Sequence, residues 1–139
     1  MTEIKYTTLK HNYSEHLDEL VNFYEPKYQK PFNRNTVLNS SIICLAIAGD
    51  EIVGAVRALT DFSRHGIIVD LMVDENFRRQ KIGSNLLKNI ALELTALKIP
   101  IVSLTTEPDA PWLVVFYEKH GFRPIAGSVN MSLGASDTQ

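Results

Sequence analysis

The sequence predicts an α/β fold with a central mixed sheet, and two observations carry this prediction. Two apolar runs, Ile42–Ala48 and Glu51–Thr60, flank a short Gly-Asp turn, which is typical of a β-hairpin. A third apolar run at 67–73 is followed by a long stretch with helical periodicity at 83–97. Because a strand–helix–strand order follows a hairpin, we expect one domain of mixed topology over residues 1–139.

The segment before the hairpin is expected to hold one strand and two short helices. Ile4–Leu9 fits a first strand, and Ser14 is placed to cap a helix that follows it. The apolar face of that helix consists of Leu17, Leu20, Val21 and Tyr24. Pro26 and Pro31 break the helix, and residues 36–39 fit a second, shorter one.

The segment after the strand expected at 67–73 begins with the clearest helix of the chain, at 83–97. Its apolar positions are Ile82, Leu86, Leu87, Ile90, Ala91 and Leu94. A buried strand is expected at 101–105, and the prolines of residues 108–111 open a last helix that Gly121 stops. A final strand is expected at 129–133.

Composition narrows the class of protein. Among 139 residues, 45% are apolar and 22% charged, which is typical of a globular chain. A net charge of −2 argues against a nucleic-acid partner. The single Cys44 allows no intrachain disulfide and no cysteine zinc site, and the four histidines show no metal-ligand spacing, so we expect no metal. Without a signal segment or a long apolar run, we expect a cytoplasmic protein with no membrane partner.

A basic turn between the strand expected at 67–73 and the long helix narrows the function most. It consists of Phe77, Arg78, Arg79, Gln80, Lys81, Ile82, Gly83 and Ser84. A helix N-terminus presents backbone N–H groups and the positive end of its dipole to an anion, and the arginines add charge. The pattern therefore predicts a polyphosphate site, with a solvated basic turn as the alternative.

The same turn resembles the acyl-CoA motif of the GNAT family of N-acetyltransferases, Arg/Gln-x-x-Gly-x-Gly/Ala. Residues 115–122 resemble that family's second motif, Phe-Tyr-x-Lys-x-Gly-Phe. The two motifs occur in the family's order and placement, and the resemblance covers about residues 42–133. A narrower likeness, to bacterial and plastid enzymes that acetylate small amines, including arylalkylamines, lies in residues 54–61, 69–73 and 121–124, with Gly127 and Met131.

The resemblance implies the GNAT acyl-CoA N-acyltransferase fold, in which the strand before the phosphate turn splays from its neighbour. The backbone of that strand would pair with pantetheine and supply an oxyanion donor, whereas its side chains are also explained by core packing. The residues implied to bind acetyl-CoA are Leu71, Met72, Val73, Arg78, Arg79, Gln80, Lys81, Ile82, Gly83, Ser84 and Phe116. Lys81 stands where the family has a glycine. With ordinary dihedral angles it could add a phosphate contact; otherwise it compromises the loop.

Tyr117 is the residue that the resemblance nominates as general acid. A phenol with a pKa near ~10 can protonate a thiolate of pKa near ~8.5 when it is held close to it. The alternative is an aromatic core residue, like its neighbour Phe116.

A general base is sought because a primary amine is almost fully protonated at neutral pH. Asp70, a lone carboxylate in an apolar strand, is the leading candidate, and the alternative is a structural carboxylate paired with Arg57. In a regular strand, Asp70 would alternate away from its neighbours. Asp61 and Asp109 are the back-up candidates.

The sequence thus predicts an acetyl-CoA-dependent N-acetyltransferase that transfers the acetyl group directly to a primary amine of a small molecule. Four aromatic residues are explained equally well as the lining of an acceptor pocket or as core: Tyr24, Tyr28, Phe32 and Trp112. Two other functions stay open, a protein or peptide acceptor and a non-catalytic CoA-binding module. A homodimer is an expectation that rests on the resemblance alone.

Overall fold

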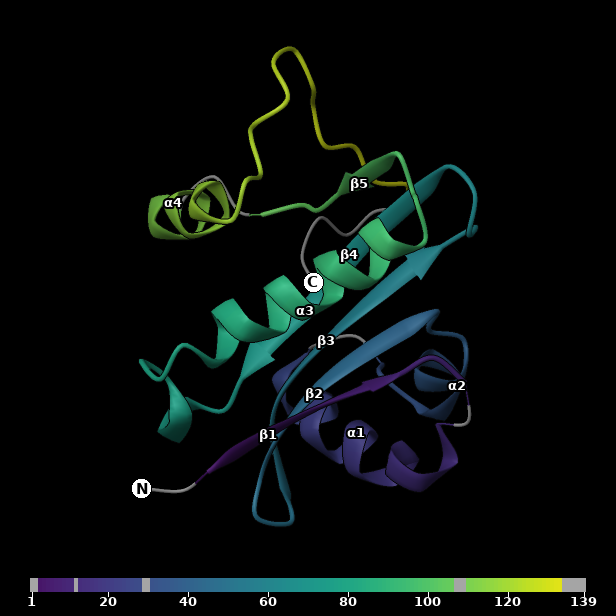
Figure 1. Ribbon diagram of the computed structural model, residues 1–139, viewed down its shortest axis with the longest axis vertical. Coiled ribbons are helices and arrows are strands. Elements are labelled where there is room, and N and C mark those ends of the chain that lie inside the picture. Colours follow the sequence, from purple (N-terminus) through teal and green to yellow (C-terminus); the bar gives the residue numbers. More distant parts are fainter. Residues whose placement is uncertain (1–2, 12, 29–30, 107–109, 134–139) are drawn as a thin grey trace. The chain divides into compact units, whose positions relative to one another are not determined.

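The predicted mixed sheet is present in the computed structural model of the chain, which describes residues 3–11, 13–28, 31–106 and 110–133. Residues 1–104 and 105–139 form two compact units. The first unit contains the strands β1 (Ile4–Leu9), β2 (Ile42–Ala48), β3 (Glu51–Thr60), β4 (His65–Val73) and β5 (Ile101–Ser103). They lie in this order across the sheet, and all neighbours are antiparallel except β4 and β5, which are parallel (Figure 1).

Strand boundaries follow the prediction closely in the hairpin and less closely at the far edge. β1, β2 and β3 have the predicted limits, whereas β4 starts earlier, at His65. β5 is shorter than predicted, and among the described residues its one partner strand is β4, through residues 65–67. The expectation of a buried strand is wrong for Ile101, which is 36% exposed because β5 is an edge strand.

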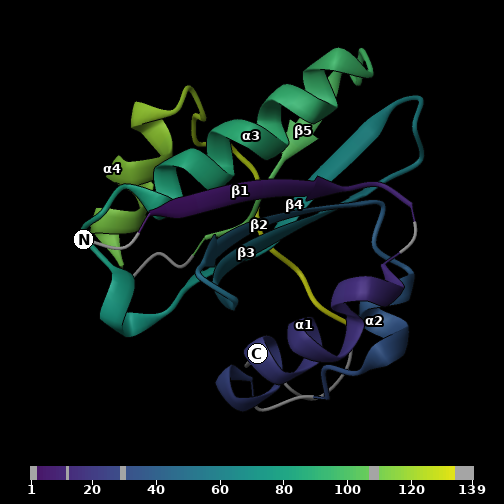
Figure 2. The same ribbon diagram turned by 60° about the horizontal axis from the view of Figure 1, so that its bottom comes forward.

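Helices cover both faces of this sheet. α3 (Ile82–Ala96) lies on one face, and α1 (Leu17–Tyr24) with α2 (Arg34–Leu38) lies on the other (Figure 2). Short 3₁₀ turns are η1 (Ser14–His16), η2 (Glu25–Lys27) and η3 (Glu75–Phe77). The prediction that Ser14 caps the first helix is wrong, because Ser14 opens η1 and His16 is the residue before α1. α2 is instead capped by Asn33, whose side chain accepts from the backbone of Asn35 and Thr36.

The predicted apolar faces of these helices form the core. Leu17, Leu20 and Tyr24 of α1 pack in one cluster with Leu45 and Ala55 of the sheet. On the other face, α3 buries Ile82, Leu86, Leu87, Ile90 and Leu94. Gly54 of β3 lets α3 approach closely, since a Cβ there would lie 3.0 Å from side-chain atoms of Ile82 and Leu86.

The second unit contains α4 (Pro111–Lys119), with Pro111 in its first turn as predicted. Gly121, with φ +92°, ends it after His120. The predicted strand at 129–133 is wrong: the described residues there have no strand, and Met131 is 91% exposed. An alternating run becomes a strand only when a neighbouring edge pairs with its backbone, and β5 has no second partner in the described part of the chain.

Candidate active site

β4 carries a bulge at Asp70. Val69 pairs with Arg57 and Met72 pairs with Ala55. Two residues of β4, at positions 70 and 71, therefore lie opposite the single residue 56 of β3. Asp70 has φ +57°, in the left-handed region that aspartate adopts more readily than most residues. The strand is therefore not regular at Asp70, so side chains before and after this residue do not follow one continuous alternation.

The C-terminal half of β4 also separates from β5. The last β4–β5 pair is Ile67 with Ser103, and no strand among the described residues pairs with this edge of β4 over residues 68–73. This is the splayed strand pair that the fold prediction requires. The side chains of residues 71–73 are half-buried, and Met72 packs against the α1-side core. Core packing thus accounts for that side chain, while the strand edge stays open.

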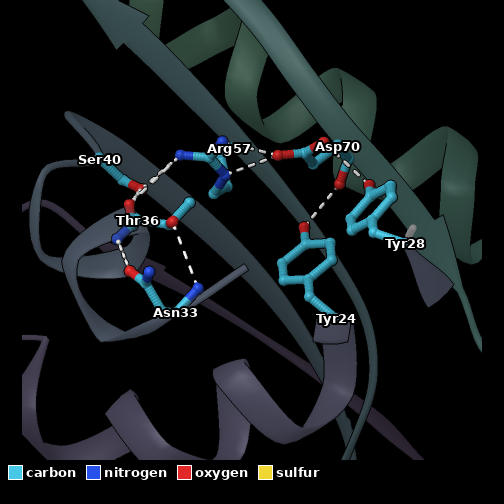
Figure 3. A network of polar contacts seen from close by, with 7 residues as sticks. All are labelled: Tyr24, Tyr28, Asn33, Thr36, Ser40, Arg57 and Asp70. Carbon is cyan, nitrogen blue, oxygen red and sulfur yellow. Dashed lines mark hydrogen bonds and ion pairs between the residues drawn. The ribbon is translucent and has the colours of Figure 1, made fainter. Parts of the chain in front are cut away.

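The carboxylate of Asp70 is held by two side chains from different elements (Figure 3). Arg57 on β3 donates from Nε and Nη2 to Oδ2, at 2.9 and 2.6 Å. Tyr28, which follows η2, donates from its hydroxyl to Oδ1 at 2.8 Å. The hydroxyl of Tyr24 on α1 donates to the backbone carbonyl of Asp70 at 2.5 Å. The geometry thus contains the Arg57 pair that the sequence offered as the structural role of Asp70.

Arg57 is a buried charge, and each of its three guanidinium nitrogens donates a hydrogen bond. It is 8% exposed, and Nη1 donates to Ser40 Oγ at 2.9 Å and to the Thr36 carbonyl at 3.4 Å (Figure 3). Its guanidinium also lies over the ring of Phe32, 5.5 Å from the centroid. The desolvation cost of a buried ion pair is offset when both charges are paired and hydrogen-bonded, as here. Arg57 therefore ties α2 and β3 to the bulge.

The aromatic residues proposed for an acceptor pocket divide into two groups. Tyr24 and Phe32 are buried, with ring centroids 4.6 Å apart, and belong to the core. Tyr28 is half-buried and stacks on both at 6.0 Å. Burial first, and the Asp70 charge next, raise the pKa of the Tyr24 and Tyr28 hydroxyls, so both stay protonated donors at neutral pH. Among the three, only Tyr28 combines partial exposure with a contact to the Asp70 carboxylate.

The basic turn leads from η3 into α3 through two left-handed residues. Arg79 has φ +68°, and Lys81, at the N-cap of α3, has φ +62° and ψ +19°. Lys81 therefore lacks the ordinary dihedral angles under which a lysine would replace glycine without strain. Arg78, Arg79 and Lys81 are all exposed, so three cations surround the start of the helix. The turn fits an anion in charge and in helix placement.

The beginning of the turn is fixed to the sheet. The Asp74 N–H donates to the Val53 carbonyl at 2.7 Å, and the Asp74 carboxylate accepts from the Asn76 N–H at 2.9 Å. The Phe77 N–H then donates to the Asp74 carbonyl at 2.9 Å. These bonds fix the end of β4 to β3, and from there the chain continues through η3 into the basic turn.

Tyr117 and Phe116 lie on α4 in the second unit. Their rings meet edge to face, with centroids 5.2 Å apart, and Phe122 lies 6.2 Å from Tyr117. Burial raises the pKa of Tyr117, so its hydroxyl is a protonated donor at neutral pH. Trp112, also on α4, is 68% exposed.

Asp61 and Asp109 are the two other carboxylates that the sequence offered as candidates for the general base. Asp61 accepts from the backbone N–H groups of Ser63, Arg64 and His65, and these bonds, that of Arg64 first, lower its pKa to about 2. Its contacts therefore organise the β3–β4 loop. Asp109 lies outside the described residues.

Two features are absent from the described residues. No three His, Cys, Asp or Glu side chains gather there as metal ligands. No helix in that part of the chain has the length and apolar character needed to cross a membrane.

Sequence reasoning missed two parts of this site. The Tyr24 hydroxyl bond to the Asp70 carbonyl was hidden because Tyr24 fits the apolar face of α1; the only signal was a polar atom on an otherwise apolar stripe. The bulge had no signal beyond a single aspartate within an apolar strand.

Comparison with known proteins agrees with this geometry. The family model described as Acetyltransferase (GNAT) family matches residues 9–122. A GNAT-family acetyltransferase of Streptococcus pneumoniae superposes with a TM-score of 0.74 at 25% identity, covering 95% of this chain and 100% of that one. An aminoglycoside acetyltransferase from an uncultured soil sample gives 0.75 at 20% identity, covering 96% and 97%. An acetyltransferase of Trypanosoma brucei gives 0.72 at 18% identity, covering 94% and 100%.

No curated protein sequence matches the chain. The family match nevertheless extends over most of its length, and the splayed strand, the basic turn and α3 have the arrangement that the family fold requires. The chain belongs to the GNAT acetyltransferase family.

Proposed function

We propose that this chain transfers the acetyl group of acetyl-CoA directly to a primary amine of a small molecule, through a single acetyltransferase domain over residues 1–139. The observation that carries the proposal is the open edge of β4 continuing into the basic turn. The backbone of Leu71, Met72 and Val73 would hold the pantetheine arm. The residues proposed for the pyrophosphate are Arg78, Arg79, Gln80, Lys81, Ile82, Gly83 and Ser84, and Phe116 is proposed as a further contact.

Each chemical task has a proposed group. The thioester supplies the acetyl group, and a backbone N–H of residues 71–73 stabilises the oxyanion, a term worth about 3 kcal/mol for one donor. Tyr117, protonated at neutral pH, returns a proton to the leaving thiolate. Asp70 as the base that removes the amine proton stays a prediction from sequence, and its contacts are considered further below.

A small amine is preferred as acceptor over a peptide. One structural relative, from a soil sample, is an aminoglycoside acetyltransferase, and this likeness supports a small-molecule amine as acceptor. A thiol-release assay with acetyl-CoA over a panel of small amines and peptides tests this preference. Turnover on peptides alone would favour a protein acceptor, and tight acetyl-CoA binding without turnover on any amine would leave the non-catalytic module.

Tyr117→Phe tests the acid. We expect kcat to fall about 10²–10⁴-fold while the Kd for acetyl-CoA changes little, because only the proton donor is removed. Tyr6→Phe is the matched control, since the Tyr6 hydroxyl contacts Asn85 of α3, outside the proposed chemistry. Equal kcat for wild type and Tyr117→Phe would exclude Tyr117 from the mechanism.

Gly83→Asp tests the phosphate site. A carboxylate in the first turn of α3 would repel the pyrophosphate, so we expect acetyl-CoA binding to disappear in isothermal titration. Asn89→Asp introduces the same charge further along α3, about 9 Å from Gly83 along the helix axis, and serves as the control. Normal binding by Gly83→Asp would place the phosphate site elsewhere.

A further inference from the structure

We infer that Asp70 is a positioning residue: Tyr24, Tyr28 and Arg57 fix its left-handed backbone, and the bulge so fixed sets the orientation of the strand edge at residues 71–73. These four residues are called the Asp70 clamp. The inference rests on the proposed function for the role of that edge.

The Asp70 clamp lies at the bulge, where the alternation of side chains between the two faces of the sheet is shifted by one residue. Val69 pairs with Arg57, on the face that α1 and α2 cover. Val73 pairs with Gly54, which faces α3. In a regular strand residues 69 and 73 would share a face, so the bulge between them exchanges the faces. Any slip at Asp70 would therefore turn the whole 71–73 segment over.

The contacts act on the backbone as well as on the carboxylate. A left-handed non-glycine residue inside a strand persists only where its surroundings hold it. Tyr24 bonds the Asp70 carbonyl, whereas Arg57 and Tyr28 bond opposite carboxylate oxygens. Three segments of the chain thus meet on one residue (Figure 3).

The same contacts disfavour Asp70 as a base. Both of its oxygens already accept hydrogen bonds, and a proton on the carboxylate would leave the buried Arg57 charge without its partner. The side chain of Asp70 is 23% exposed, whereas that of Arg57 is 10% exposed. The free-energy cost of an unpaired charge would therefore fall on Arg57, the more buried of the two residues. The ion pair with Arg57 therefore favours a structural, positioning role for Asp70 over a role as general base.

Tyr24→Phe is the decisive variant, because it removes one contact to the backbone of Asp70 and leaves the carboxylate in place. Tyr13→Phe is its control: Tyr13 also belongs to the α1-side core, but its hydroxyl donates to the Ser40 and Ser41 carbonyls, at 2.6 and 3.0 Å, and not to Asp70. Comparable stability losses are expected from both.

The first measurement is amide hydrogen exchange in peptides covering residues 71–74, which needs no catalysis. We expect exchange there, including the Asp74 amide bonded to Val53, to be about tenfold faster in Tyr24→Phe and unchanged in Tyr13→Phe. Unchanged exchange in both variants would overturn the inference. Should Tyr24→Phe fail to fold, Tyr28→Phe takes its place, because that hydroxyl belongs to a half-buried side chain.

The second measurement separates the two roles of Asp70. If it positions the strand, Tyr24→Phe lowers kcat/KM for acetyl-CoA about 10- to 100-fold, and Asp70→Asn leaves the acid limb of the pH–rate profile in place. If Asp70 is the base, Asp70→Asn abolishes turnover and that limb, while Tyr24→Phe behaves as wild type; this result would overturn the inference. A wild type that acetylates no amine would contradict the proposed function, and the exchange measurement would still decide the inference.

Discussion

Replacing Lys81 with glycine should stabilise the protein. Lys81 has φ +62° at the N-cap of α3, and a left-handed conformation costs a residue with a Cβ about 1–2 kcal/mol. Glycine removes this cost but adds about 0.4–1 kcal/mol of conformational entropy to the unfolded chain. The net gain is then about 0.5–1 kcal/mol, which for a chain of this size corresponds to a rise in Tm of about 2–4 °C.

Lys98 provides a matched control for this backbone effect. It has φ +61°, and it ends α3 in a Schellman motif: the Ile99 N–H donates to the Leu94 carbonyl at 3.2 Å and the Lys98 N–H to the Thr95 carbonyl at 2.9 Å. Lys98→Gly should raise Tm by a similar amount without changing acetyl-CoA affinity, because it lies at the opposite end of the helix.

Measurements of acetyl-CoA affinity distinguish the effect of the Lys81 side chain from that of its backbone conformation. If the ammonium contacts a phosphate, Lys81→Gly and Lys81→Ala should both weaken acetyl-CoA binding by up to about fivefold, the range of an exposed charge pair. Only Lys81→Gly should gain stability, since alanine keeps the Cβ. Differential scanning calorimetry and isothermal titration measure the two effects. A Tm that falls in Lys81→Gly but rises in Lys98→Gly would refute the assigned strain.

Two further predictions concern the sheet and its loop. Gly54→Ala should destabilise the protein by about 1–3 kcal/mol in urea unfolding, because its Cβ would press on Ile82 and Leu86; a loss below about 0.5 kcal/mol would mean that α3 adjusts freely. Asp61 has its pKa lowered to about 2, so its bonds stabilise the fold above the unfolded pKa of about 3.9 and lose this effect as the pH falls toward 2. The Tm difference between wild type and Asp61→Ala should therefore be full at pH 6 and shrink between pH 4 and pH 2, and a constant difference would contradict this role.

Much of the fold was predictable because its signals are local. The alternation and Gly-Asp turn of the β2–β3 hairpin, and the 3.6-residue period of α3, are properties of short windows, and the structure has both nearly as predicted. The run at 129–133 has the same local alternation without forming a strand. A strand requires a partner edge, and no local window reports whether such an edge is present.

The sequence by itself determined the order of the main elements up to α4, the basic turn and the family, since each depends on residues close together in the chain. Only the tertiary structure decided the conformations on which the site depends. Asp70 and Lys81 are left-handed, and the partners of Asp70 come from α1, the segment after η2, and β3. The left-handed conformation of Asp70 is held by contacts from distant segments, and such contacts exist only once the chain has folded.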